Sequence, residues 1–118
     1  MNLCIDQGNS RTKIALFKKD GRIVKNLLYK SFTSADVERL FSLYPITQSI
    51  VSSVANMEPA VINALNRLSK KFVLFDHLTP LPIKNCYQTP ETLGHDRIAA
   101  AVGAAHLCPG QNLLIVDA

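Results

Sequence analysis

Two clusters of turn-forming residues divide the start of the sequence into short extended segments. Gln7-Gly8-Asn9-Ser10 and Asp20-Gly21 contain residues that tolerate the left-handed backbone conformation, which is typical of tight β-hairpin turns. The residues around these turns, Asn2 to Asp6, Thr12 to Lys18 and Arg22 to Phe32, are predicted strands. Because hairpins join neighbouring antiparallel strands, the sequence predicts a three-stranded meander at the start of the chain.

Two segments with helical spacing follow the predicted meander. Thr33 or Ser34 is expected to cap the first helix and Pro45 to end it, and Asn56 is expected to cap the second helix. Each segment has an apolar stripe that would face a sheet. The stripes are Val37, Leu40, Phe41 and Tyr44 in the first segment, and Val61, Ile62, Leu65 and Leu68 in the second.

Strand candidates at Ser49 to Val54 and Lys71 to Asp76 follow the two helices. The predicted order is β-β-β-α-β-α-β, which is not the strict alternation of a doubly wound sheet. It matches the mixed sheet of the α/β, RNase H-like fold, in which the first strand is central and the later strands lie parallel to it. We therefore predict a mixed five-stranded sheet with helices on its faces.

The remainder of the chain predicts the start of another structural unit. His77 to Pro90 is irregular, a helix is expected from about Asp96 to His106, and Leu113 to Val116 repeats the apolar pattern of the first strand before an aspartate. Because the chain stops there, we expect a truncated second domain of similar fold. The predicted domains are residues 1–90 and residues 91–118.

Composition limits the expected partners. Charged residues make up 19% of the chain and the net charge is +4. Scattered basic residues do not form the dense face that nucleic acid requires, and no apolar run approaches the ~20 residues of a membrane span. Cys4, Cys86 and Cys108 are far apart and form no Cys-x-x-Cys pair, which favours a reducing cytoplasm. We expect a cytoplasmic protein that binds an anionic small molecule, and neither nucleic acid nor a membrane.

A carboxylate, a glycine turn and a cation occur together near the N-terminus. Asp6 can hold a hydrated metal ion, Gly8 lets the backbone approach a ligand closely, and Lys13 supplies positive charge. Asn9 and Ser10 add hydrogen-bonding groups, so the segment suits a nucleotide phosphate with Mg²⁺. It is not a Walker-type loop, because a strand follows the turn. An ordinary hairpin with an Asx turn explains the same residues equally well.

A second polar group lies where the irregular segment meets the alanine-rich helix. A general base for an alcohol must be a carboxylate or imidazole held rigidly beside the reacting oxygen, and Asp96 fulfils this condition. The alternative is that Asp96 only begins the helix and that Arg97 is a solvated neighbour. That alternative leaves the preceding Tyr-x-Thr-Pro-x-Thr-Leu-Gly, from Tyr87 to Gly94, unexplained.

The sequence resembles the type III pantothenate kinases along its whole length. The resemblance rests on Asp-Gln-Gly-Asn-Ser-x-x-Lys at 6–13, Ser-Ser-Val at 52–54 and Tyr-Gln-Thr-Pro-Glu-Thr-Leu-Gly-His-Asp-Arg at 87–97. The final Val-Asp-Ala is similar to the start of that family's Asp-x-Gly-Thr motif. The Gly-Thr is absent from this chain, so this part of the protein is not expected to carry every catalytic contact.

The resemblance implies transfer of the γ-phosphoryl group of ATP to pantothenate, the first step towards coenzyme A. It implies that Asp96 is the catalytic base, that Asp117 holds a monovalent cation (K⁺ or NH₄⁺), and that the enzyme is a homodimer. The implied pantothenate pocket consists of Tyr87, Gly94, His95, Asp96 and Arg97, with His95 lining the pocket rather than moving protons. The implied site for ATP and Mg²⁺ consists of Asp6, Gln7, Gly8, Asn9, Ser10, Arg11, Thr12 and Lys13.

Two other functions are compatible with the sequence. One is phosphorylation of a different small molecule, or ATP hydrolysis, by another member of the acetate and sugar kinase and actin-like superfamily. The other is a non-catalytic regulatory role as a transcription accessory protein. The presence of Asp6, Lys13 and Asp96 argues against a loss of catalysis, and the dispersed basic charge argues against direct binding to DNA.

Overall fold

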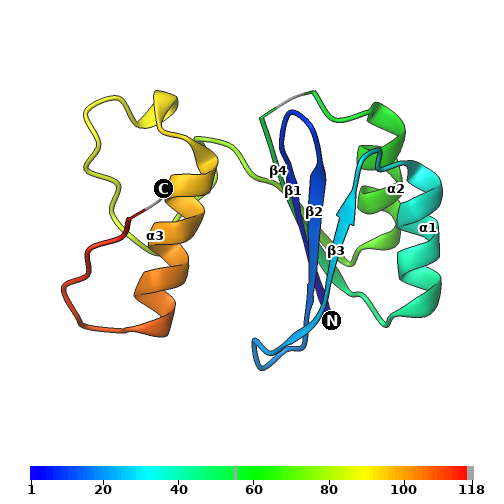
Figure 1. The fold of residues 1–118 in the computed structure, drawn as a ribbon, viewed down its shortest axis with the longest axis horizontal. Helices are drawn as coiled ribbons and strands as arrows, with labels where there is room; N and C mark the ends of the chain where they lie inside the picture. The colour runs from blue at the N-terminus through cyan, green and yellow to red at the C-terminus, as the bar shows by residue number, and fades with distance from the viewer. Residues whose placement is uncertain (55, 117–118) are drawn as a thin grey trace. The chain divides into compact units, whose positions relative to one another are not determined.

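The computed structural model describes residues 1–54 and 56–116 of the chain. These residues form two compact units, residues 1–74 and the described residues from Phe75 onward (Figure 1). The elements, in chain order, are β1 (Asn2–Gln7), β2 (Thr12–Phe17), β3 (Ile23–Tyr29), α1 (Ser34–Leu43), β4 (Gln48–Ser53), α2 (Pro59–Leu68), β5 (Lys71–Leu74), the 3₁₀ helix η1 (Pro90–Thr92) and α3 (His95–Leu107).

The first unit is built on one five-stranded sheet in the order β3-β2-β1-β4-β5. β1 pairs antiparallel with β2, and β2 pairs antiparallel with β3, so the predicted meander is confirmed. On its other side β1 pairs in parallel with β4, which pairs in parallel with β5. The prediction of a mixed α/β sheet with its first strand at the centre is therefore also confirmed.

One face of this sheet carries the hydrophobic core. Leu3 and Leu16 are fully buried, and Ile5 and Ile14 are each only 2% exposed. They belong to one cluster with Leu65 and other apolar residues of α1 and α2. Both helices lie over the same face of the sheet, as Figure 1 shows. Because alternate residues of a strand point to opposite faces, the intervening residues of β1 and β2 lie on the face away from this core.

The two helix starts differ in how well the sequence predicts them. Thr33 caps α1 as predicted: its backbone N–H and its hydroxyl each donate to Asp36 Oδ2 at 2.9 Å. Asn56 is a wrong prediction, because α2 begins at Pro59 with Glu58 as its N-cap. Proline has no N–H to leave unsatisfied and its fixed φ suits the first helical turn, so it decides where this helix begins.

The second unit contains the irregular connector, η1 and α3. The helix predicted from about Asp96 to His106 is confirmed, with one more residue at each end. The strand predicted at Leu113 to Val116 is wrong: no strand is present there, and Leu114 is 91% exposed. An apolar run forms a strand only where a neighbouring strand satisfies its backbone groups, and the described part of this unit offers none.

No helix within the described residues is long and apolar enough to span a bilayer.

The packing of α2 on the sheet yields a stability prediction. Leu65 is fully buried, whereas Leu43, near the end of α1, is 62% exposed. Leu65→Ala should lower the free energy of unfolding by about 3 kcal/mol, because it removes buried apolar contacts and leaves a cavity. Leu43→Ala should change it by less than about 0.5 kcal/mol. Urea unfolding measures both changes, and equal losses would contradict the assignment of the core.

Candidate functional site

A row of polar residues crosses three neighbouring strands of the first unit. Asp6 in β1 lies opposite Lys13 in β2, and the parallel register places Ser52 of β4 on its other side. Directly paired residues share a face of a sheet, so all three lie on the face away from the core. Asp6 and Lys13 are both exposed. The arrangement brings together a carboxylate, a cation and a hydroxyl at one end of the sheet.

The turn between β1 and β2 closes beside this row. The Gly8 N–H donates to the Arg11 carbonyl oxygen at 3.0 Å, and Asn9, Ser10 and Arg11 are exposed. Gly8 does not use a positive φ. A Cβ there would lie 3.4 Å from the Arg11 carbonyl oxygen, at the limit of ordinary van der Waals contact, so neither backbone conformation nor space requires glycine at this position. The predicted hairpin is confirmed, with its polar side chains open to solvent.

The start of α3 holds a carboxylate in a defined position. Gly94 is the N-cap, and its carbonyl oxygen accepts hydrogen bonds from the N–H groups of Arg97 at 3.1 Å and Ile98 at 3.2 Å. Asp96 lies in the first turn, where a helix favours negative charge. A Cβ on Gly94 would approach Asp96 Oδ1 to 2.4 Å. The absence of a side chain at Gly94 therefore leaves the space that this carboxylate oxygen occupies.

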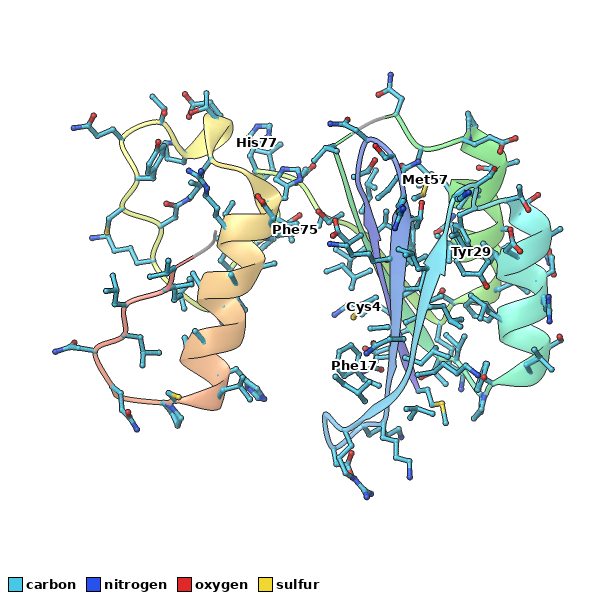
Figure 2. All side chains as sticks on the ribbon, in the orientation of Figure 1. Cys4, Phe17, Tyr29, Met57, Phe75 and His77 are labelled. Carbon is cyan, nitrogen blue, oxygen red and sulfur yellow. The ribbon has the colours of Figure 1, made fainter. Side chains whose placement is uncertain are left out.

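His95 takes part in aromatic packing within the second unit. Its ring contacts that of Phe75 edge to face, with centroids 5.1 Å apart and planes at 64°. Phe75 is 9% exposed, and its side chain is visible in Figure 2. No sequence signal indicated this pair, because Phe75 belongs to the predicted strand Lys71 to Asp76 and resembles a buried strand residue.

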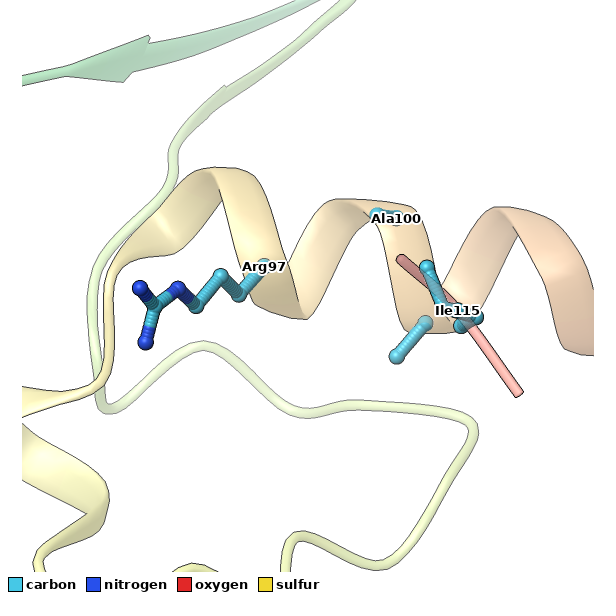
Figure 3. A pocket seen from close by; sticks show the side chains of 4 residues that line it. Arg97, Ala100 and Ile115 are labelled. Carbon is cyan, nitrogen blue, oxygen red and sulfur yellow. The ribbon is translucent and has the colours of Figure 1, made fainter. Parts of the chain in front are cut away.

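Arg97 lines a pocket beside α3. Figure 3 shows its side chain extending from the helix, with Ala100 and Ile115 labelled farther along. The lining residues are Arg97, Ala100, Ala101 and Ile115. A guanidinium group next to methyl groups can bind an anionic group attached to a short apolar chain.

Local hydrogen bonds shape the segment that leads to this helix. The Tyr87 N–H donates to Asn85 Oδ1 at 3.0 Å, and the Tyr87 side chain is 51% exposed. The hydroxyl groups of Thr89 and Thr92 are 2.5 Å apart, and the Thr92 N–H donates to the Thr89 carbonyl oxygen at 2.9 Å. Asn85 was not a predicted site residue. Its residue type is nevertheless a turn signal, because an asparagine side chain often accepts a hydrogen bond from the backbone two residues later.

The two predicted groups of site residues belong to different units. Asp6 to Lys13 lie in the first unit, and Tyr87 and residues 94–97 lie in the second. Asp117, the predicted ligand of a monovalent cation, lies outside the described residues. Within residues 1–54 and 56–116, no three His, Cys, Asp or Glu side chains come together as a metal site. Asp6 is an exposed carboxylate, and a Mg²⁺ ion that is held by a single carboxylate takes its other ligands from phosphates and water.

These features define an α/β protein with a mixed sheet, an exposed polar hairpin beside a carboxylate and a cation, and a helix start that presents a second carboxylate. The family model for type III pantothenate kinase matches residues 2–118, and the chain belongs to that family. A type III pantothenate kinase of Bacteroides fragilis (strain ATCC 25285) is 40% identical over 119 residues, which is 100% of this chain and 48% of the relative. One of Christiangramia forsetii is 41% identical over 119 residues, 100% of this chain and 49% of the relative. The chain thus spans about half the length of the relatives it matches.

Gly94, the N-cap of α3, and Gly103, inside that helix, are both exposed and yield a matched pair of predictions. Gly103→Ala should stabilise the protein by roughly 0.5–1 kcal/mol, because the added Cβ meets no atom within 4 Å and alanine favours helix. Gly94→Ala should instead destabilise it by about 1 kcal/mol, because alanine is a poor N-cap and its Cβ displaces the Asp96 carboxylate. Thermal unfolding of the two variants tests this difference. Equal stabilisation by both would contradict the role assigned to Gly94.

Proposed function

We propose that the full-length protein phosphorylates pantothenate with ATP, the first step of coenzyme A synthesis. The observation that carries this proposal is the match of the family model to residues 2–118, which includes both polar groups. The hairpin of the first unit suits the phosphate donor, and the start of α3 suits the alcohol acceptor. A kinase needs both functions, whereas a simple nucleotide-binding module needs only the first.

The proposal extends to the architecture of the full-length protein. We assign the mixed sheet to the RNase H-like class, and the order β3-β2-β1-β4-β5 supports that assignment. We assign residues 91–118 to the start of a second domain of the same kind. We also propose that the protein is a homodimer, as the family resemblance implies. The cysteine pattern supports a location in the cytoplasm.

On the acceptor side, Asp96 accepts the proton of the primary hydroxyl of pantothenate. The hydroxyl oxygen then forms a bond to the γ-phosphorus while the bond from that phosphorus to the β–γ bridging oxygen breaks, and ADP leaves. The position of Asp96 at a helix start fixes its carboxylate on a rigid element, as general base catalysis requires. Arg97 pairs with the carboxylate of pantothenate, and the methyl groups beside it contact the adjoining carbon chain.

On the donor side, the residues of the hairpin hold the nucleotide. Lys13 neutralises phosphate charge, and the turn at Gly8 brings the backbone close to the phosphate oxygens. Asp6 would hold Mg²⁺ through water, and the ion would supply further charge neutralisation. Asp117 is proposed as the ligand of K⁺ or NH₄⁺.

The decisive experiment is a coupled assay of ATP turnover by full-length protein with pantothenate, with and without K⁺. Absence of pantothenate-dependent turnover together with tight, salt-sensitive DNA binding would favour the regulatory alternative instead.

Replacement of the proposed base tests the chemistry. Asp96→Asn should lower kcat by about 10²–10⁴-fold, because the amide cannot accept the hydroxyl proton. Glu91→Gln is the control: this exposed carboxylate lies in η1, close to Asp96 in the sequence, and the variant should retain its activity. Circular dichroism verifies that both variants fold. Unchanged turnover in Asp96→Asn would remove Asp96 from the mechanism.

Replacement of the proposed substrate anchor tests the binding mode. Arg97→Met should raise KM for pantothenate by roughly 10–100-fold through loss of a charged hydrogen bond, and should leave KM for ATP unchanged. The control is Arg39→Met, at an exposed position of α1. A substrate analogue with an alcohol in place of the carboxylate should be used equally well by wild type and Arg97→Met. A variant that still distinguishes the two substrates would contradict the pairing.

A further inference from the structure

Two hydrogen bonds join the end of β4 to Gln7, the residue before the turn at residues 8–11. Ser53 lies opposite Gln7 in the parallel β1–β4 register, and its hydroxyl donates to Gln7 Oε1 at 2.6 Å. The Val54 N–H donates to the Gln7 carbonyl oxygen at 3.1 Å. Gln7 is the last residue of β1 and precedes Gly8, so both bonds hold the residue from which the turn departs.

The side chain of Gln7 lies on the opposite face from that of Asp6. Consecutive residues of a strand alternate between faces, and Thr12, which pairs with Gln7, is 4% exposed on the core side. Both Gln7 and Ser53 are partly buried. The amide of Gln7 therefore does not join the row formed by Asp6 and Lys13, and its observed partner is the Ser53 hydroxyl.

We propose that Ser53 is a positioning residue for nucleotide binding, acting through Gln7 to fix the hairpin at residues 8–11. The inference rests on the proposed function, because it takes that hairpin to be the phosphate site. The Ser53 hydroxyl holds the Gln7 side chain in one rotamer and extends the β1–β4 pairing up to the turn. In this arrangement the turn retains the hydrogen bond from the Gly8 N–H to the Arg11 carbonyl oxygen, and Asp6 stays opposite Lys13. This assigns a function to the Ser-Ser-Val motif at 52–54.

The same strand provides a matched control. Near the other end of β4, the hydroxyl oxygens of Ser49 and Ser69 are also 2.6 Å apart, and Ser49 is 4% exposed. Ser69→Ala removes that hydrogen bond without touching the residues of the hairpin. Ser69→Ala therefore measures the general effect of losing a hydroxyl contact on β4. Any larger effect of Ser53→Ala on nucleotide binding is then specific to the hairpin.

The test uses full-length wild type, Ser53→Ala, Ser53→Thr and Ser69→Ala. Calorimetric titration with MgATP, in the absence of pantothenate, should give a Kd about five-fold higher for Ser53→Ala, the factor that corresponds to one ordinary hydrogen bond. Ser53→Thr keeps the hydroxyl and should restore wild-type affinity. Ser69→Ala should lower Tm but leave Kd unchanged. In hydrogen exchange, the Gly8 amide should exchange faster in Ser53→Ala than in the other proteins, and KM for pantothenate should stay the same in all four.

Two results would overturn the proposal. One is an unchanged Kd for MgATP in Ser53→Ala, and the other is an equal rise in Kd in Ser69→Ala, which would indicate only a general loss of stability. Pantothenate turnover by the wild type tests the proposed function separately, because the titration contains no pantothenate. A wild-type protein that does not bind MgATP would refute both proposals.

Discussion

The pairing of β1 with a strand on each side is the constraint on which the first unit depends. Its residues alternate between the core, through Leu3 and Ile5, and the polar face, through Asp6. A shift of the register by one residue would move the apolar side chains to solvent and bury the carboxylate. Burial of each large apolar side chain is worth about 1.5–3 kcal/mol, so the core strongly disfavours such a shift. The packing of the core thereby also fixes the position of Asp6 between Lys13 and Ser52.

Much of the fold follows from local patterns in the sequence. Turn residues and alternating apolar positions predicted the meander, and helical spacing predicted α1 and α2, because each pattern reflects one buried face. The alanine-rich run predicted α3. The errors occurred where a local pattern competes with another constraint. Asn56 is a good cap by residue type, but the proline at 59 sets the start of α2. The run from Leu113 to Val116 is apolar enough for a strand, but a strand also requires a partner.

The candidate site was predictable as far as its residues are neighbours in the sequence. The motifs at 6–13 and 87–97 contain the turn, the helix start and the charged groups together. The contacts between distant residues were not predictable: Phe75 meets His95, and Ser53 meets Gln7, only after the chain has folded. The relation of Gly94 to Asp96 is local, yet it depends on the rotamer of one carboxylate, which no sequence pattern specifies.

The bond between Ser53 and Gln7 has a consequence for the order of folding. The hairpin that joins β1 and β2 closes a short loop, which forms on the microsecond scale. Its anchor lies 46 residues farther along the chain and requires the crossover through α1 to be complete. During synthesis the residues of the hairpin therefore emerge before those of β4. The contact of Ser53 with Gln7 is therefore added to the turn between β1 and β2 only when β4 pairs with β1.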